Sequence, residues 1–116
     1  MNSQRHLEFH ERQAEAMDGL TDALLPAIPR HWRHAQPEFD VHYSTVTKTR
    51  AIHHRLTNPT TGEEVGDFPP DLFGASTTLH MVFTEYEQSW KRAIIELTFH
   101  ENGSFRQRKA NYTYGP

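Results

Sequence analysis

With 116 residues, the chain is long enough for one domain, which we expect to span residues 1–116. The absence of cysteine excludes disulfides, thiolate catalysis and cysteine-based zinc sites, and it is compatible with the cytoplasmic location that we expect. A net charge of −3 with neutral histidines excludes a strong global attraction to nucleic acid or to an anionic membrane. No apolar run is typical of a signal peptide or of a membrane span.

The first expected element is a helix over residues 4–25. Apolar side chains such as Phe9, Leu20 and Leu24 recur at the three- and four-residue spacing of a helix, and acidic side chains occupy the opposite side. Pro26 ends this pattern because proline lacks the N–H group that a continuing helix needs.

Two strands are expected next, over residues 39–47 and 50–57. Side chains alternate in the first strand, whereas two histidines interrupt the pattern of the second. Residues 58–62 read Asn-Pro-Thr-Thr-Gly and predict a turn, because proline presets φ and glycine accepts a left-handed conformation. A short third strand over residues 63–66 is an optional part of this prediction.

A second helix is expected after a loop over residues 67–74, which contains two consecutive prolines. Ser76 is the expected N-cap of this helix. The helix carries a regular apolar stripe, made of Leu79, Val82, Phe83, Tyr86 and Trp90, and Trp90 closes it.

The C-terminal hairpin is the element on which we expect the rest of the chain to pack. Its strands are expected over residues 93–100 and 104–114, joined by a tight or bulged turn at Asn102-Gly103, since both residues tolerate positive φ. One face of the first strand carries Ala93, Ile95, Leu97 and Phe99. Together the elements predict an α+β fold, with two helices on one face of an antiparallel sheet of four to five strands, in the order α-β-β-(β)-α-β-β.

Histidines are the first candidates for chemistry. His6 and His10 are four residues apart on the expected helix, so both could face one metal ion, but spacing fixes no third ligand. His31 and His34 flank a tryptophan in a turn. We expect no metal and no cofactor, with a small histidine-dependent, metal-binding enzyme using either pair as the alternative.

Other catalytic patterns have little support. His53 and His54 are adjacent in a strand and should point to opposite faces, which is poor geometry for chelation. No serine lies in a G-x-S-x-G context, and no glycine-rich phosphate loop occurs. We therefore expect no enzyme and no catalytic residue.

A basic group lies in the last expected strand, at Arg106, Arg108 and Lys109. With Phe105 and Tyr112 nearby, this strand has the basic and aromatic character of an RNA-binding surface. Lysine and arginine on an exposed strand also protect against aggregation, and the surrounding composition is neutral to acidic. We expect no nucleic-acid partner, and a nucleic-acid-binding adaptor is a further alternative.

Acidic side chains are the last candidate group. They could form ordinary solvated faces, or they could complement a basic protein partner and speed its association. They are Glu8, Glu11, Glu15, Asp18 and Asp22 in the first helix, Glu63, Glu64 and Asp67 near the turn, and Glu85 and Glu87 in the second helix.

Five short motifs follow the expected elements in order along most of the chain: Ile28-Pro29-x-x-Trp32, Ser89-Trp90, Leu97-Thr98-Phe99, Asn102-Gly103-Ser104-Phe105 and Asn111-Tyr112-x-Tyr114. In this order the chain resembles the YezG-type immunity (antitoxin) family of bacterial polymorphic toxin systems. The resemblance implies a non-enzymatic protein that binds a cognate toxin domain, often a nuclease, and neutralises it by stoichiometric occlusion.

A nuclease holds phosphates with lysine and arginine, so an inhibitor of it should offer carboxylates. We therefore expect the partner-binding residues to be Glu63, Glu64, Asp67, Glu85 and Glu87. The oligomeric state and the identity of the toxin are left open.

Overall fold

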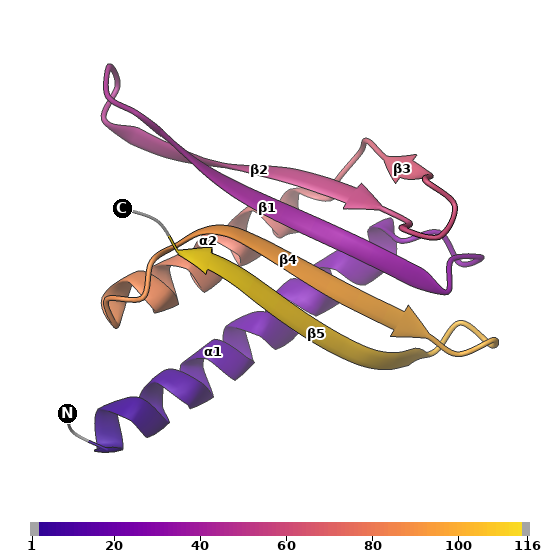
Figure 1. Ribbon diagram of the computed structural model, residues 1–116, viewed down its shortest axis with the longest axis horizontal. Helices are drawn as coiled ribbons and strands as arrows, with labels where there is room; N and C mark the ends of the chain where they lie inside the picture. Colours follow the sequence, from indigo (N-terminus) through magenta and orange to yellow (C-terminus); the bar gives the residue numbers. More distant parts are fainter. Residues whose placement is uncertain (1–2, 115–116) are drawn as a thin grey trace.

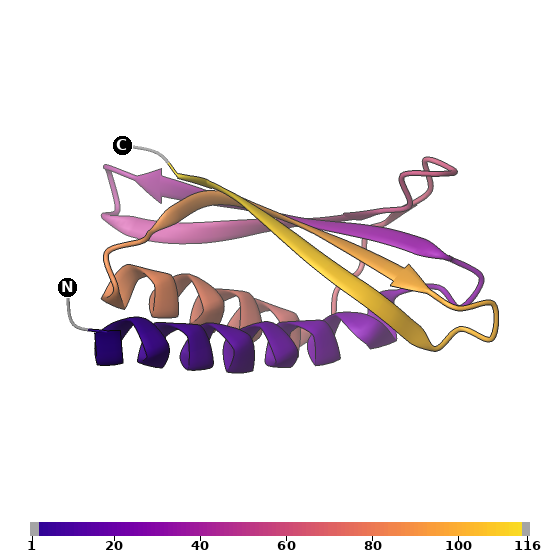
Figure 2. The same ribbon diagram turned by 60° about the horizontal axis from the view of Figure 1, so that its bottom comes forward.

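The computed structural model describes residues 3–114, which form two helices on one face of a five-stranded antiparallel sheet (Figures 1 and 2). The strands lie in the order β3-β2-β1-β4-β5. This arrangement confirms the predicted α+β fold and its element order, with the optional third strand present. In chain order the elements are α1 (Ser3–Leu24), the 3-10 turn η1 (Leu25–Ala27), β1 (His34–Ser44), β2 (Thr49–Thr57), β3 (Glu64–Val65), α2 (Pro70–Glu85), β4 (Trp90–Phe99) and β5 (Phe105–Tyr114).

The core lies between the central strands and the two helices. Ala93, Ile95 and Leu97 of β4 are at most 1% exposed, which confirms the face predicted from the two-residue alternation. Phe39 of β1 is equally buried beside them. Burying each large apolar side chain of this kind stabilises the fold by about 1.5–3 kcal/mol. The helices pack Leu20, Leu24, Leu79 and Phe83 against this face.

Strand β1 begins five residues earlier than predicted because Pro37 is tolerated inside it. The paired residues of the β1–β4 ladder stop at Ala35 and resume at Glu38. Pro37 is in register with Leu56 of β2, and on the β4 side it lies in this interruption, where a missing N–H group breaks no residue pair.

Helix α2 begins at Pro70, so the prediction of Ser76 as its N-cap was wrong. Pro69 holds the extended conformation of an N-cap, with φ −64° and ψ 145°, and Pro70 has the fixed φ that suits the first helical position. The two prolines read as loop signals in the sequence are in fact the start of the helix. Ser76 lies one and a half turns inside it, at 1% exposure.

Helix α2 also ends earlier than predicted, at Glu85, and Trp90 opens strand β4 instead. The Gln88 N–H donates to the Phe83 carbonyl at 2.8 Å, and the Glu87 N–H donates to the Thr84 carbonyl at 3.0 Å. These two bonds form a Schellman motif, with Glu87 in the left-handed position at φ 59°. Trp90 is buried in the core as the first residue of β4. Its spacing fits the apolar stripe of α2, although the helix has already ended before it.

The Schellman motif predicts that Glu87→Gly raises the free energy of unfolding by about 0.5–1 kcal/mol, because glycine adopts positive φ without a Cβ penalty. Urea unfolding of both proteins measures the difference. Glu87→Ala is the matched control, since it removes the carboxylate but keeps the strained backbone, and it should give no gain. An equal gain from alanine would assign the effect to the charge.

Candidate functional site

The structure places the five predicted partner-binding carboxylates at two opposite ends of the molecule. Glu63, Glu64 and Asp67 lie on and around β3, whereas Glu85 and Glu87 lie at the C-terminal end of α2 (Figures 1 and 2). The structure therefore brings together the first three and the last two, but it does not join them into one surface.

Three of these carboxylates also make contacts inside the chain. Glu63 Oε2 accepts hydrogen bonds from Trp32 Nε1 and His31 Nε2, each at 3.2 Å, and these bonds, that of His31 first, lower the pKa of Glu63. Glu64 pairs with Arg55 at 3.2 Å. Because these groups are exposed, such pairs orient the side chains more than they stabilise the fold.

At the other end, Glu85 forms an ion pair with Arg12 of α1, and this hydrogen bond is the main cause of the lowered pKa of Glu85. The Arg12 guanidinium also lies over the ring of Tyr86, 5.8 Å from its centroid. The pair thus joins the end of α2 to α1.

Of the two predicted histidine pairs, His6 and His10 lie together in the structure, whereas His31 and His34 have different surroundings. The rings of His6 and His10 contact each other edge-to-face with centroids 4.7 Å apart, whereas His31 bonds to Glu63 and His34 opens β1. Within residues 3–114, no three histidine or acidic side chains are grouped as metal ligands.

The basic residues of the last strand are also divided. Arg108 turns toward α1, where it donates hydrogen bonds to Asp18 at 3.1 Å and to Thr21 at 2.9 Å. Lys109 is exposed on the opposite side of the sheet, paired in register with Glu96. Arg108 therefore ties β5 to α1 and is not part of one basic surface with Lys109.

The sheet face turned away from the helices, here called the outer face, is polar and held together by charged side chains. Arg92 Nε bonds to Asp40 Oδ1 at 2.6 Å across β4 and β1, and Arg55 reaches Glu38 at 3.9 Å across β2 and β1. Arg55 also bonds to Glu64, so the β3 end continues into this face. Its charged and histidine side chains include Glu38, Asp40, His42, His53, Arg55, Arg92, Glu96 and Lys109.

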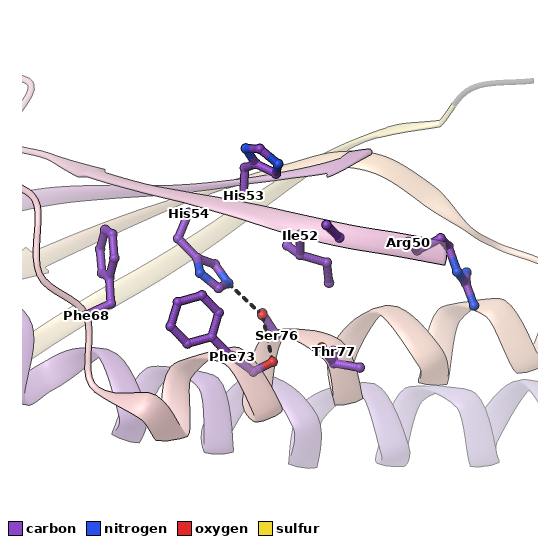
Figure 3. Close-up of a pocket in the computed structure, with 9 residues that line it drawn as sticks. Arg50, Ile52, His53, His54, Phe68, Phe73, Ser76 and Thr77 are labelled. Carbon is purple, nitrogen blue, oxygen red and sulfur yellow. Dashed lines mark hydrogen bonds between the residues drawn. The ribbon is translucent and has the colours of Figure 1, made fainter. Parts of the chain in front are cut away.

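A cleft of about 550 Å³ lies between β2 and α2 (Figure 3). At its wall, His54 Nε2 and Ser76 Oγ are 2.8 Å apart, and Ser76 Oγ donates to the Phe73 carbonyl at 3.2 Å. With the serine proton used in this way, His54 Nε2–H is the donor to Ser76 and Nδ1 is left as an acceptor. His54 Nδ1 is buried and has no hydrogen-bond partner within the described residues.

This serine–histidine pair does not match a nucleophilic catalytic site. Such a site needs an accessible serine and a group that orients the second ring nitrogen of the histidine. Here Ser76 is buried within a helix, and His54 Nδ1 has no orienting partner among residues 3–114. The bond positions the ring of His54 between Phe68 and Phe73, with ring centroids 5.8 and 4.5 Å away.

The sequence prediction missed this cleft, although it placed the two histidines correctly. His53 and His54 do point to opposite faces of β2, and His53 contacts His42 on the outer face at 4.2 Å between centroids (Figure 3). One signal in the sequence could have located the cleft. Of the three inward positions between residues 50 and 54, two carry polar side chains, Arg50 and His54. Ser76 carried no such signal, because it was interpreted as a cap.

In comparisons with known proteins, no family model matches this sequence and no curated protein is significantly similar to it. Neither helix of the described chain has the length and apolar character that crossing a membrane requires.

The environment of His54 predicts how stability depends on pH. Burial, followed by the nearby charge of His53, lowers the pKa of His54 in the folded chain. The unfolded chain therefore binds this proton first as the pH falls below about 6.5. The contribution of neutral His54 to the free energy of unfolding is therefore fully present above that pH, and it is lost as the pH falls through the folded-state pKa.

His54→Asn should consequently reduce the loss of unfolding free energy between about pH 7.5 and 5.5, measured by urea unfolding. His53→Asn, on the outer face, is the control and should keep the dependence of the native chain. Some dependence should persist in the His54 variant, because burial and then Arg50 also lower the pKa of His80. An unchanged profile in the His54 variant would contradict this assignment.

Proposed function

We propose that this chain is a cytoplasmic immunity protein that binds a cognate bacterial toxin domain and neutralises it by stoichiometric occlusion. A nuclease is the toxin chemistry that best suits the carboxylates at the two ends of the molecule. The proposal is supported by the motif order that resembles the YezG-type family and by the polar sheet face that the fold leaves exposed to solvent.

The observation that carries the proposal is the open outer face of the sheet. Both helices cover the other face, so the outer face presents an extended polar surface to solvent. Its ion pairs join neighbouring strands, such as Arg92 with Asp40, and hold the side chains in place before a partner arrives. Binding to pre-ordered side chains costs less conformational entropy than binding to free ones.

The motifs that carry the resemblance are largely core residues. Trp32, Trp90 and Leu97 are at most 2% exposed. They support a shared fold, whereas contacts with a partner must come from exposed residues. The β3 end is the more favourable acidic surface, because Glu64 links it through Arg55 to the outer face.

The proposal predicts a 1:1 complex with the toxin domain encoded beside the gene. Co-purification and calorimetric titration of the two purified proteins measure the complex, and a nuclease assay of the toxin measures neutralisation. Activity should fall in proportion to the added chain and reach zero at equimolar amounts. No complex at micromolar concentrations, with both proteins folded, would overturn the proposal.

Charge reversal at each end identifies the surface. Glu64→Lys combined with Asp67→Lys should weaken binding by tenfold or more and reduce its salt dependence, because carboxylates attract the phosphate-binding cations of a nuclease. Glu87→Lys tests the opposite end, and Glu11→Lys with Glu15→Lys on α1 is the matched control. If only the control weakens binding, the predicted carboxylates are not the contact surface.

A further inference from the structure

We propose that the cleft between β2 and α2 binds an aromatic carboxylic acid whose carboxylate is joined to the ring by a chain of a few carbons, with the ring of the ligand against Phe68 and Phe73 and its carboxylate at Arg50. This site is separate from the proposed toxin surface and does not depend on the proposed function.

The size and lining of the cleft suit a small molecule. Its volume of about 550 Å³ is in the ordinary range for ligand pockets, about 300–1,000 Å³. Apolar side chains dominate one end, and a few polar groups lie along the cleft, as such sites require. The apolar lining consists of Ile52, Phe68 and Phe73, and the polar lining includes Arg50, His54, Ser76 and Thr77.

The apolar end is built for a planar ring. Phe68 and Phe73 meet the ring of His54 edge-on, so three rings surround this end (Figure 3). Phe73 is 51% exposed, which leaves a large apolar surface open to solvent. An aromatic ligand would cover that surface and could pack edge-to-face, gaining both burial and ring contacts.

The opposite end carries a positive charge that has no carboxylate partner among residues 3–114. The side chain of Arg50 extends from β2 toward α2 at the far end of the cleft from Phe68 (Figure 3). Among the described residues, its one recorded hydrogen bond is a long contact of 3.4 Å to His80 Nδ1. A planar guanidinium matches a carboxylate with two parallel hydrogen bonds.

Electrostatics along the cleft favours an anion throughout. Within residues 3–114 no aspartate or glutamate lines it, and the titratable side chains that point into it are Arg50 and His54, whereas that of His53 points to the outer face (Figure 3). A neighbouring cavity of about 390 Å³ shares Arg50 and adds His80 and Lys91, again without an acidic side chain. A carboxylate at Arg50 thus meets only neutral or positive groups from β2, α2 and the start of β4.

Titration of the isotopically labelled full chain with sodium 4-phenylbutyrate, followed by ¹⁵N–¹H NMR at pH 7.5, tests the proposal. Residues 50 and 54 are about 13 Å apart along the strand, so the probe needs a chain between its ring and its carboxylate. The alcohol 4-phenylbutan-1-ol is the neutral ligand of similar shape, and sodium chloride controls for ionic strength. Phenylbutyrate should give saturable shifts confined to residues 50–54 and 68–77, with a dissociation constant on the order of 1 mM. It should bind about tenfold tighter than the alcohol, as expected for a hydrogen bond to a charged group.

Two variants separate the parts of the site. Arg50→Gln should remove the preference for phenylbutyrate over the alcohol, while Arg30→Gln, a matched change in the turn before β1, should preserve it. Thr77→Trp places a large ring in the cleft from an exposed helix position and should abolish binding of both ligands. Shifts scattered outside the cleft, equal affinity for both ligands, or no saturation by about 20 mM would overturn the proposal.

Discussion

One-sided burial of the sheet is the constraint on which the rest of this structure depends. The central strands β1 and β4 turn Phe39, Ile95 and Leu97 toward the helices, and no other apolar surface in the described chain is comparably covered. With both helices on that face, the opposite face must remain in water. An antiparallel sheet accepts this arrangement because alternate side chains can be polar. The outer face accordingly carries cross-strand ion pairs, which keep exposed strands in register and discourage association with other sheets.

The cleft arises where this burial is incomplete. Strand β2 is next to the edge of the covered sheet, and two of its three inward positions between residues 50 and 54 are Arg50 and His54. Neither side chain can be closely packed against a helix without losing solvation, so β2 and α2 stay apart there. Ser76 compensates one nitrogen of His54, and Phe73 closes over the ring while remaining half exposed. The polar residues that prevent close packing at this point therefore leave a recess with aromatic side chains at one end and an arginine at the other.

Core and surface carry different kinds of information in this protein. The tryptophans and the β4 motif that resemble an immunity family are buried, so they specify the fold. Under the proposed function, recognition of a partner would depend instead on exposed carboxylates. The fold divides these between an end that continues into the outer face and an end tied to α1 through Arg12. In the sequence these carboxylates differ little from one another, but in the structure their neighbours give the two groups different surroundings.

The apolar stripes of the two helices, the alternation of β4, the proline that ends α1 and the Asn-Gly turn were enough to predict two helices, an antiparallel sheet and the face that carries the core, although not the ends of α2. These features depend on interactions between residues a few positions apart, and such interactions can be read from the spacing of residue types along the chain. Only the tertiary structure decided that Trp90 belongs to a strand, that Ser76 meets His54, and that Glu63–Asp67 and Glu85–Glu87 lie at opposite ends. Each of these depends on contacts between residues more than twenty positions apart or on a left-handed residue, Glu87, that its side chain does not announce. Spacing along the chain cannot specify such contacts, because they are set by how α1 and α2 pack against the sheet.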